Sequence, residues 1–394
     1  MKSEWTKKKL SDIADFNPRE TIKKGAIAKK IPMDVLRPFY RDIPYYVEED
    51  FSGGTKFRNG DTIMARITPC LENGKTAQVS ILNDGEVGFG STEYIVFRAK
   101  EGIADKDYLY YLVCSPEVRE PAIKSMVGSS GRQRVQTDVV KNLEIDVPPL
   151  VEQEKIGSFL KALDDKIALN DRINKNLEQQ AEALFHSLFI ENANPTWKDG
   201  MLSDLGTVVA GGTPSKTNPE YYSKQGIAWI TPKDLSLNKS KFISHGEIDI
   251  SELGFSKSSA TKMPTGTVLF SSRAPIGYIA IAANEVTTNQ GFKSVVPNKN
   301  IGTAFIYYLL KFLLPTIEGM ASGSTFKEIS GAGMKSVPVV IPDNETIEKF
   351  NTFCTPIFQQ QEVLEAENSR LADIRNALLP KLMSGELDVS NIKI

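Results

Sequence analysis

The sequence predicts an α+β protein in which two repeated α/β domains are separated by two long antiparallel helices, which form a coiled coil with pseudo-two-fold symmetry. Two observations predict this fold: an internal repeat, and apolar residues at alternating three- and four-residue steps in both copies of its second part. At an offset of 194, the residues Pro148, Phe159, Asn174, Leu177, Ala183, Leu184 and Leu188 match Pro342, Phe353, Asn368, Leu371, Ala377, Leu378 and Leu382.

The repeat divides the chain into domain, helix, domain and helix. We expect domains at residues 1–150 and 196–341, a long helix within 151–195, and a second long helix with a C-terminal tail within 342–394. Trp5, Leu10, Ser11 and Asp12 match Trp197, Leu202, Ser203 and Asp204 at an offset of 192. The 394 residues, 41% of them hydrophobic, suffice for two cores. A duplicated frame with diverged domains suits a protein that holds two related but different targets at a set distance.

The long helices are predicted from their heptad seams, each of which is too short to bury itself alone. The seam residues are Leu163, Ile167, Asn170, Asn174, Leu177, Ala181, Leu184 and Leu188, and then Ile357, Gln361, Leu364, Asn368, Leu371, Arg375, Leu378 and Leu382. An antiparallel pairing of the two helices would place the domains at opposite ends. The polar seam residues either specify the register or lie at the exposed edge of a helical hairpin.

The start of the second helix is predicted from Thr355 and Pro356, a suitable N-cap and first-turn pair. Residues 344–353 would then form a separate short helix. Each long helix would have about 28 residues and a length of about 40–45 Å.

Each domain is predicted to hold a largely antiparallel or mixed sheet with one apolar helix. In the first domain we expect strands at residues 62–67, 78–82, 94–98 and 143–147, and a helix at 107–114. In the second we expect strands at 268–271, 279–283, 293–296 and 337–341, and a helix at 303–314.

Charge is segregated along the repeat. The two domain segments have net charges of +1 and +4, whereas the two helix segments have −3 and −4. Basic and polar side chains gather on corresponding loops: Lys23, Lys24, Lys29, Lys30, Arg66, Lys75, Arg132, Gln133 and Arg134 in the first domain, and Lys216, Lys233, Lys257, Lys262, Arg273, Ser324, Thr325 and Lys327 in the second. Lysine suits phosphate contact, and Arg and Gln can also read base edges. These residues are candidates for DNA binding, and a solvated basic surface is the alternative.

Several function classes find no support in the sequence. Glu72–Thr76 resembles the end of a phosphate-binding loop, but Pro69 stands where the first glycine would be. The two histidines, His186 and His245, and three scattered cysteines form no metal or catalytic set. We therefore expect no catalytic residues, no metal site and no cofactor in this chain. No apolar run is long enough for a membrane span, and a cytoplasmic location is expected.

Particular tracts resemble a known family. Gly211–Ser215 (GGTPS), Tyr221-Tyr222 and Gly226–Leu235 (GIAWITPKDL) look like the opening of a target-recognition domain in specificity (S) subunits of type I DNA restriction–modification enzymes. The tract Leu378–Leu387 (LLPKLMSGEL) is similar to the family's C-terminus, and the resemblance covers essentially the whole chain. The first domain lacks the GGTP tract and has Asn17 and Pro18 in that region, a divergence expected where targets differ.

The resemblance implies a non-catalytic reader of double-stranded DNA. Each recognition domain would read half of a bipartite target, and the helices would set the spacing and dock two methyltransferase (M) subunits. Those subunits would bring S-adenosylmethionine for adenine N6 methylation, and restriction (R) subunits, where present, would use ATP and Mg. Two alternatives stay open: a coiled-coil scaffold whose basic domains bind a protein partner, and an enzyme in its own right.

Overall fold

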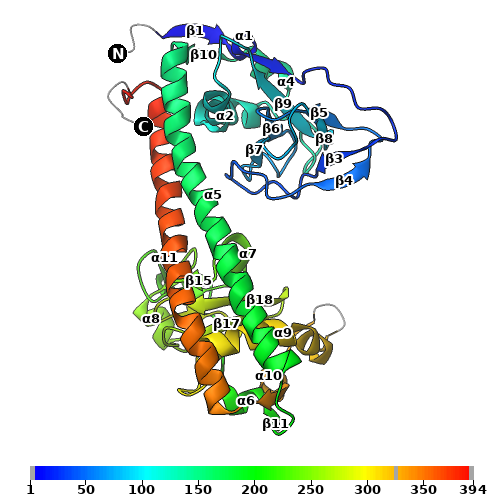
Figure 1. The fold of residues 1–394 in the computed structure, drawn as a ribbon. Helices are drawn as coiled ribbons and strands as arrows, with labels where there is room; N and C mark the ends of the chain where they lie inside the picture. Colours follow the sequence, from blue (N-terminus) through cyan, green and yellow to red (C-terminus); the bar gives the residue numbers. More distant parts are fainter. Residues whose placement is uncertain (1–4, 324–326, 390–394) are drawn as a thin grey trace. The chain divides into compact units, whose positions relative to one another are not determined.

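The computed structural model describes residues 5–323 and 327–389, and the chain divides into two compact units. Unit 1 comprises Met1–Leu169 and Glu367–Ile394, and unit 2 comprises Asn170–Ala366. Both unit boundaries fall inside long helices, so each unit contains one α/β domain and a stretch of both helices (Figure 1). The predicted fold class is confirmed.

The domain of unit 1 is built on two four-stranded sheets. Its strands are β1 (Thr6–Lys9), β2 (Ala14–Phe16), β3 (Ile27–Ile31), β4 (Val47–Asp50), β5 (Thr55–Phe57), β6 (Thr62–Ala65), β7 (Thr76–Gln78), β8 (Gly88–Gly90), β9 (Tyr94–Ala99) and β10 (Glu144–Val147). Its short helices are α1 (Leu10–Ile13), α2 (Lys106–Cys114), α3 (Pro116–Lys124) and α4 (Thr137–Lys141). One sheet has the order β2-β9-β6-β7, and the other has the order β4-β3-β8-β5, in which β3 and β8 are parallel.

The expected elements of the first domain are present, with one shifted strand. The strand predicted at 78–82 is β7, which ends at Gln78, because its partner β6 begins at Thr62 and the preceding residues turn away. The helix predicted at 107–114 is α2, whose N-cap Asp105 accepts the backbone N–H groups of Asp107 and Tyr108. Strands β1 to β5 and β8 are not among the predicted strands, because they have little hydrophobic alternation.

The domain of unit 2 has a five-stranded sheet, β12-β20-β17-β18-β15, as its main layer. Its strands are β11 (Lys198–Met201), β12 (Gly206–Ala210), β13 (Tyr222–Ser223), β14 (Trp229–Ile230), β15 (Phe242–Ile243), β16 (Asp249–Ile250), β17 (Val268–Ser272), β18 (Ile276–Ala282), β19 (Thr287–Thr288), β20 (Lys293–Pro297) and β21 (Pro338–Ile341). Its helices are α6 (Leu202–Leu205), α7 (Pro232–Leu237), α8 (Glu252–Ser256), α9 (Thr303–Met320) and α10 (Gly331–Lys335), with a 3₁₀ turn at Pro219–Tyr221. The four predicted strands and the predicted helix are all found, and the helix continues through Pro315 to Met320.

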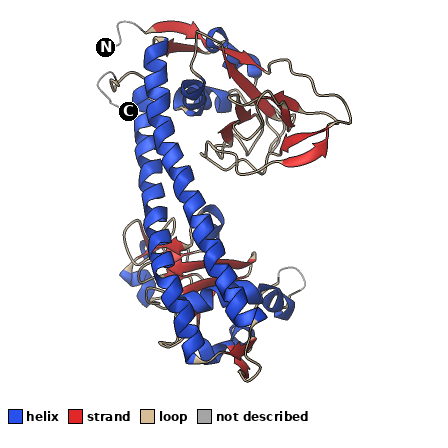
Figure 2. Cartoon of the chain, in the orientation of Figure 1, coloured by secondary structure: helices blue, strands red, loops and turns tan. Residues whose placement is uncertain are grey.

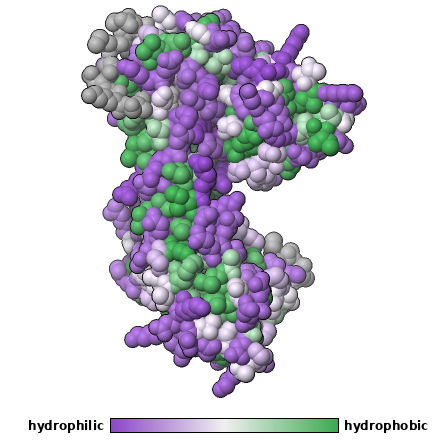
Figure 3. Space-filling view, viewed as in Figure 1, coloured by the Kyte–Doolittle hydropathy of each residue, from purple (hydrophilic) through white to green (hydrophobic). Residues whose placement is uncertain are grey.

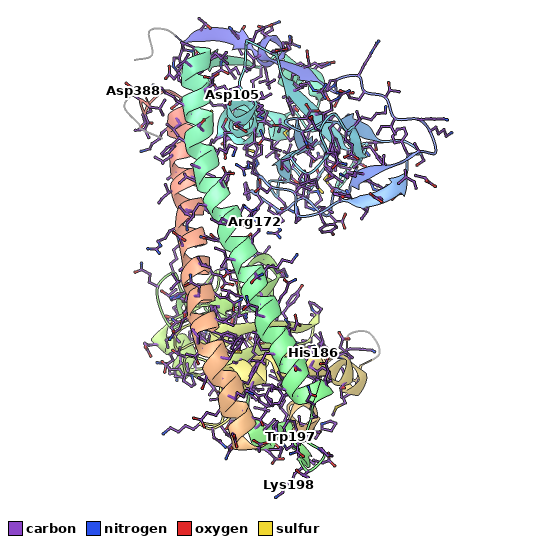
Figure 4. All side chains as sticks on the ribbon, viewed as in Figure 1. Asp105, Arg172, His186, Trp197, Lys198 and Asp388 are labelled. Atoms are coloured by element: carbon purple, nitrogen blue, oxygen red, sulfur yellow. The ribbon has the colours of Figure 1, made fainter. Side chains whose placement is uncertain are left out.

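Both domains close in the same way. The first strand pairs antiparallel with the last, β1 with β10 and β11 with β21, and each domain begins with a tryptophan whose indole bonds an acid near the start of a long helix. Trp5 Nε1 donates to Glu152 Oε2 at 3.1 Å, and Trp197 Nε1 donates to Asp343 Oδ2 at 2.8 Å. Figure 4 labels Trp197 beside the beginning of the second long helix. The tryptophan repeat seen in the sequence therefore has an equivalent structural role in each unit.

The two long helices are α5 (Leu150–His186, 37 residues) and α11 (Asn344–Met383, 40 residues), both longer than predicted. At 1.5 Å per residue they measure about 55 and 60 Å. A π-helical turn, Ser187–Glu191, follows α5. In Figure 2 they are the two long blue helices, and the cross-helix contacts within each unit show that they run antiparallel. Among the described residues, no helix is both long and apolar enough to cross a bilayer.

The predicted start of the second helix at Thr355 is wrong, because α11 is continuous from Asn344. Thr355 Oγ1 donates to the carbonyl oxygen of Asn351 at 2.7 Å, a bond typical of a helix interior rather than of an N-cap. Around Pro356 the helix is held by buried residues on both sides, Phe350, Cys354 and Ile357. Burial of this face outweighs the helix-breaking tendency of a single proline.

Candidate nucleic-acid interface

In the first domain, two of the predicted arginines, Arg66 and Arg134, meet the carboxylate of Glu93 at the end of β6. Glu93 accepts hydrogen bonds from Arg134 Nε and Nη2 at 2.7–3.0 Å, and it lies 3.9 Å from Arg66 Nε. The Glu93 hydrogen bonds raise the pKa of Arg134 above its ordinary value. Arg134 Nη1 also donates to the carbonyl oxygen of Arg132 at 3.5 Å, so these contacts together hold the guanidinium in a fixed direction, although the side chain is still 45% exposed.

The second domain has the same backbone arrangement at the end of β17. In the first domain Arg66 N donates to Glu93 O and Val135 N to Arg66 O; in the second, Ser272 N donates to Gly291 O and Ile329 N to Ser272 O. Isolated bridges link Arg134 with Ile67 and Glu328 with Arg273. By this register Glu328 occupies the position of Arg134. We call these two equivalent places the strand-end sites.

The side chains at the second strand-end site differ from those at the first. Glu328 pairs with Arg273 at 3.3 Å and with Lys293 at 3.5 Å, so an acid lies between two cations where the first site has an acid between two arginines. An equivalent frame therefore presents different hydrogen-bonding groups in the two domains. The sequence predicted Arg66, Arg134 and Arg273 as DNA-binding candidates. It did not predict Glu93, Lys293 or Glu328, because only basic and polar side chains on loops were expected to contact DNA.

Several candidate cations make ion pairs within the protein. Lys29 is buried, pairs with Glu86 at 2.9 Å and lies over the ring of Tyr46, and Lys30 pairs with Glu49 at 2.9 Å. Lys75 Nζ donates to the carbonyl oxygen of Met33 at 2.9 Å. In the second domain the pairs are Lys233 with Glu247 at 2.6 Å and Lys262 with Glu285 at 3.3 Å. These contacts hold the loops of each domain and leave fewer charges for an external phosphate.

Six candidate cations are exposed and form no ion pair with the described residues: Lys23, Lys24, Arg132, Lys216, Lys257 and Lys327. Gln133 is half-buried, and its backbone carbonyl accepts from Thr68 N at 3.0 Å. Ser324 and Thr325 lie outside the described residues. The candidates are thus divided between a few unpaired charges on loops and a larger group that stabilises those loops.

The predicted helix seam is buried or half-buried at every position. In unit 1, Arg375 Nη1 on α11 donates to Asp164 Oδ1 on α5, and Tyr111 OH donates to Asp164 Oδ2 at 2.6 Å. Asp164 is thereby shared between the opposite helix and the domain. In unit 2, Gln361 Nε2 donates to the carbonyl oxygen of Asn174 at 3.2 Å. The polar seam residues Arg375 and Gln361 therefore make cross-helix bonds rather than lying at an exposed edge.

A buried lysine joins the second domain to both helices within unit 2. Lys241 Nζ contacts Glu178 on α5 and Gln361 Oε1 on α11, the latter at 2.7 Å. Burial would raise the pKa of Glu178, but Lys241 and Lys311 outweigh it and lower that pKa to about 2. Burial lowers the pKa of Lys241, and Glu178 offsets part of this effect. The carboxylate of Glu365 accepts the backbone N–H groups of Lys241 and Phe242 at 2.8 and 3.0 Å.

Among residues 5–323 and 327–389, no group of three or more His, Cys, Asp or Glu side chains could hold a metal ion. His186, labelled on α5 in Figure 4, is exposed, with its ring centroid 6.0 Å from that of Phe312. His245 Nδ1 lies 3.3 Å from Asp249 Oδ1.

A family model described as "Type I restriction modification DNA specificity domain" matches the chain twice, over residues 2–179 and 194–370. The chain is 25% identical to the HindI specificity subunit of Haemophilus influenzae, covering 86% of this chain and 89% of that subunit. A 158-residue match to the MjaIX specificity subunit of Methanocaldococcus jannaschii is 40% identical, but covers only 40% of this chain and 36% of that subunit. The crystal structure of a type I restriction–modification S subunit from M. genitalium has the same fold, with a TM-score of 0.60, 17% identity and 96% of each chain covered.

Proposed function

The chain belongs to the type I restriction–modification DNA specificity family, and from this premise we propose that its two domains each read one half of a bipartite DNA target. The chain is the non-catalytic DNA-recognition component of a type I complex. The half-sites differ in sequence because the two domains present different side chains on an equivalent frame.

The pair of strand-end sites is the observation that carries this proposal. Backbone hydrogen bonds place Arg134 and Glu328 at equivalent positions, yet one is a cation and the other an acid. An arginine fork suits the acceptors of guanine, whereas a carboxylate accepts from the amino group of cytosine. Such a difference supports two unlike half-sites.

The long helices are proposed to set the spacing between half-sites and to dock two methyltransferase subunits. In each unit the helices expose apolar side chains: Leu169 and Ile374 in unit 1, Ile173 and Val363 in unit 2, each at least 38% exposed. Apolar surface is visible along the helices in the space-filling view (Figure 3). Exposed apolar patches on a folded protein are typical of protein interfaces.

The partners would supply all of the chemistry. S-adenosylmethionine is proposed to bind the methyltransferase subunits, ATP and Mg the restriction subunits, and no cofactor is proposed for this chain. Its described residues contribute recognition and positioning.

Long-read sequencing of DNA from the source cell tests the proposal. We expect N6-methyladenine in a two-part motif, and loss of that motif when the gene for this chain is deleted. Replacing residues 196–341 with the corresponding domain of another family member should change one half of the motif only. Persistence of every two-part motif after the deletion, or a change in both halves after the replacement, would contradict the proposal.

The competing function is a coiled-coil scaffold whose domains bind a protein. A gel shift with the chain assembled with its methyltransferase subunits separates the two. A DNA reader retains motif-containing duplex over competitor DNA at moderate salt, while a protein-binding scaffold does not.

A further inference from the structure

The second domain contains a cavity of about 530 Å³ that the strand-end site does not use. Its wall is formed by Tyr222 and Trp229, and its polar lining includes Thr213, Asn289, Gln290 and Lys216. All of these residues lie in unit 2. The volume is in the range of sites that hold small organic groups.

Close backbone packing builds this cavity from two loops. A Cβ atom on Gly211 would lie 1.9 Å from Asn289 O, and a Cβ atom on Gly212 would lie 2.4 Å from Ala260 N, so only glycine fits at either position. Gly212 N donates to Thr288 O at 2.9 Å. Gly211 therefore lets the loop bearing Thr213 lie against the loop bearing Gln290, and Gly212 lets the same loop approach Ala260.

The aromatic wall is fixed through its polar atoms. Trp229 Nε1 donates to Gly212 O at 3.0 Å, and Tyr222 OH donates to Pro214 O at 2.7 Å. The two rings meet edge to face at an interplanar angle of 66°, with centroids 5.7 Å apart. Because their polar groups are satisfied within the protein, these side chains offer the cavity only aromatic surface, on which a planar ring can pack.

One carboxylate and one side-chain amide that line the cavity, those of Asp234 and Asn289, already accept hydrogen bonds within the protein. Asp234 Oδ2 accepts from Thr231 N and Oγ1, and Asp234 Oδ1 accepts from Glu247 N. Asn289 Oδ1 accepts from Gly291 N at 2.9 Å. Their acceptor atoms hold the loops in place.

Gln290 is different, because only one end of its exposed side chain is engaged. Thr213 Oγ1 donates to Gln290 Oε1, which orients the amide, and Nε2 donates to none of the described residues. The cavity therefore presents an amide donor beside an aromatic wall. A base edge with a carbonyl acceptor is complementary to this donor.

The charge at the mouth suits a phosphate. Lys216 is exposed and forms no ion pair with the described residues, whereas Lys233 is neutralised by Glu247 at 2.6 Å. One unpaired ammonium group beside a base-sized aromatic cavity matches a single nucleotide unit.

We propose that this cavity receives one nucleotide of the DNA half-site read by the second domain, with its base against Tyr222 and Gln290 Nε2 and its phosphate at Lys216. The inference rests on the proposed function and identifies a specificity-determining residue. Gln290 selects a keto base, guanine or thymine, over an amino base at that position.

Gln290→Glu tests this assignment, because glutamate keeps an acceptor for Thr213 but replaces the Nε2 donor with an acceptor. The complex assembled with methyltransferase subunits would be tested against duplexes carrying each base pair at each position of the motif. We expect the preference at one position in one half to change from guanine or thymine to adenine or cytosine, by about 10- to 100-fold in relative affinity. Gln225→Glu, the same change on an exposed residue outside the cavity lining, should leave every preference unchanged.

Two further variants complete the test. Lys216→Ala should weaken binding to all sequences equally. It should also reduce the slope of log affinity against log salt concentration by about one. If Gln290→Glu does not fold, Thr213→Val tests the assignment in its place. This variant frees the Gln290 amide to rotate and should reduce discrimination between bases at the same position of the motif. Unchanged base preferences in the folded Gln290 variant, or in Thr213→Val when that variant alone folds, would overturn the cavity assignment. Failure of the unmodified complex to select any motif would overturn the proposed function instead.

Discussion

Asp164 and Arg375 form a buried ion pair between α5 and α11 in unit 1, with side chains only 6% and 9% exposed. Tyr111 OH donates to the second oxygen of Asp164, so that carboxylate joins both helices and the first domain. Removing one member of such a pair leaves the other charge buried without its partner, which costs far more than loss of a surface pair.

We expect Asp164→Asn to lower the free energy of unfolding of unit 1 by about 3 kcal/mol. Lys166→Gln is the matched control, because it breaks a more exposed pair with Glu367 at 3.3 Å between the same helices, and should cost less than about 1 kcal/mol. Urea unfolding of the full chain measures both. Equal losses in the two variants would show that Asp164 is not a buried anchor.

Glu178→Gln should destabilise unit 2 by about 3 kcal/mol, because Lys241 would stay buried without the carboxylate that its ammonium group contacts. Glu182→Gln removes the more exposed partner of Lys311, at 3.3 Å, and should cost less than about 1 kcal/mol. Urea midpoints for the two variants provide the comparison. A larger loss for Glu182→Gln would reverse the assigned roles.

The contribution of Glu178 to the stability of unit 2 should decrease at acid pH. The pKa of this carboxyl is lowered from 4.5 to about 2 in the folded protein, so its stabilisation is complete above about pH 4.5 and is lost as the pH falls toward 2. The difference in unfolding free energy between the unmodified chain and Glu178→Gln should therefore shrink over this interval. A difference that stays constant from pH 6 to pH 2.5 would contradict the ionised pair.

Arg134→Ala should relax base discrimination in the half-site read by the first domain, by about 1–3 kcal/mol at one position. Lys124→Ala provides a control, because Lys124 is a highly exposed cation on α3 of the same domain, paired only with Glu120. Binding to single-base variants of the motif measures the effect. Loss of discrimination in both halves would contradict a domain-specific role.

Lengthening both long helices should lengthen the spacer between half-sites. Inserting seven residues after Leu169 in α5 and seven after Ala366 in α11, at the boundaries between the units, keeps the heptad register and adds about 10 Å, or about three base pairs. The methylated motif of cells carrying this variant gives the spacer directly. An unchanged spacer with methylation retained would rule out the helices as the determinant of spacing.

The helices could be predicted well because their signal is local. The three-and-four spacing of Ile357, Leu364 and Leu382 depends only on helix geometry, and all three residues are buried as expected. The start of α11 could not be predicted, because Thr355 and Pro356 favour a helix start locally. Because Phe350 and Cys354 pack in the core, the helix continues through Thr355 and Pro356.

The strand-end sites were predicted only in part. Arg66, Arg134 and Arg273 were recognisable as loop cations, but nothing near Glu93 or Glu328 in the sequence marks them as partners. Glu93 lies 41 residues from Arg134, and Glu328 lies 55 residues from Arg273. Only the folded backbone brings these pairs together.

By itself the sequence determined the duplication, the two paired helices and the resemblance to DNA specificity subunits, because repeats, heptads and short motifs depend on residues near one another in the chain. The tertiary structure decided which charges are available. It pairs Lys29, Lys30 and Lys233 within the protein, buries Lys241 between the helices, and leaves Lys216 exposed beside the Gln290 cavity. A side chain's availability depends on what surrounds it in space, and those neighbours come from distant parts of the chain.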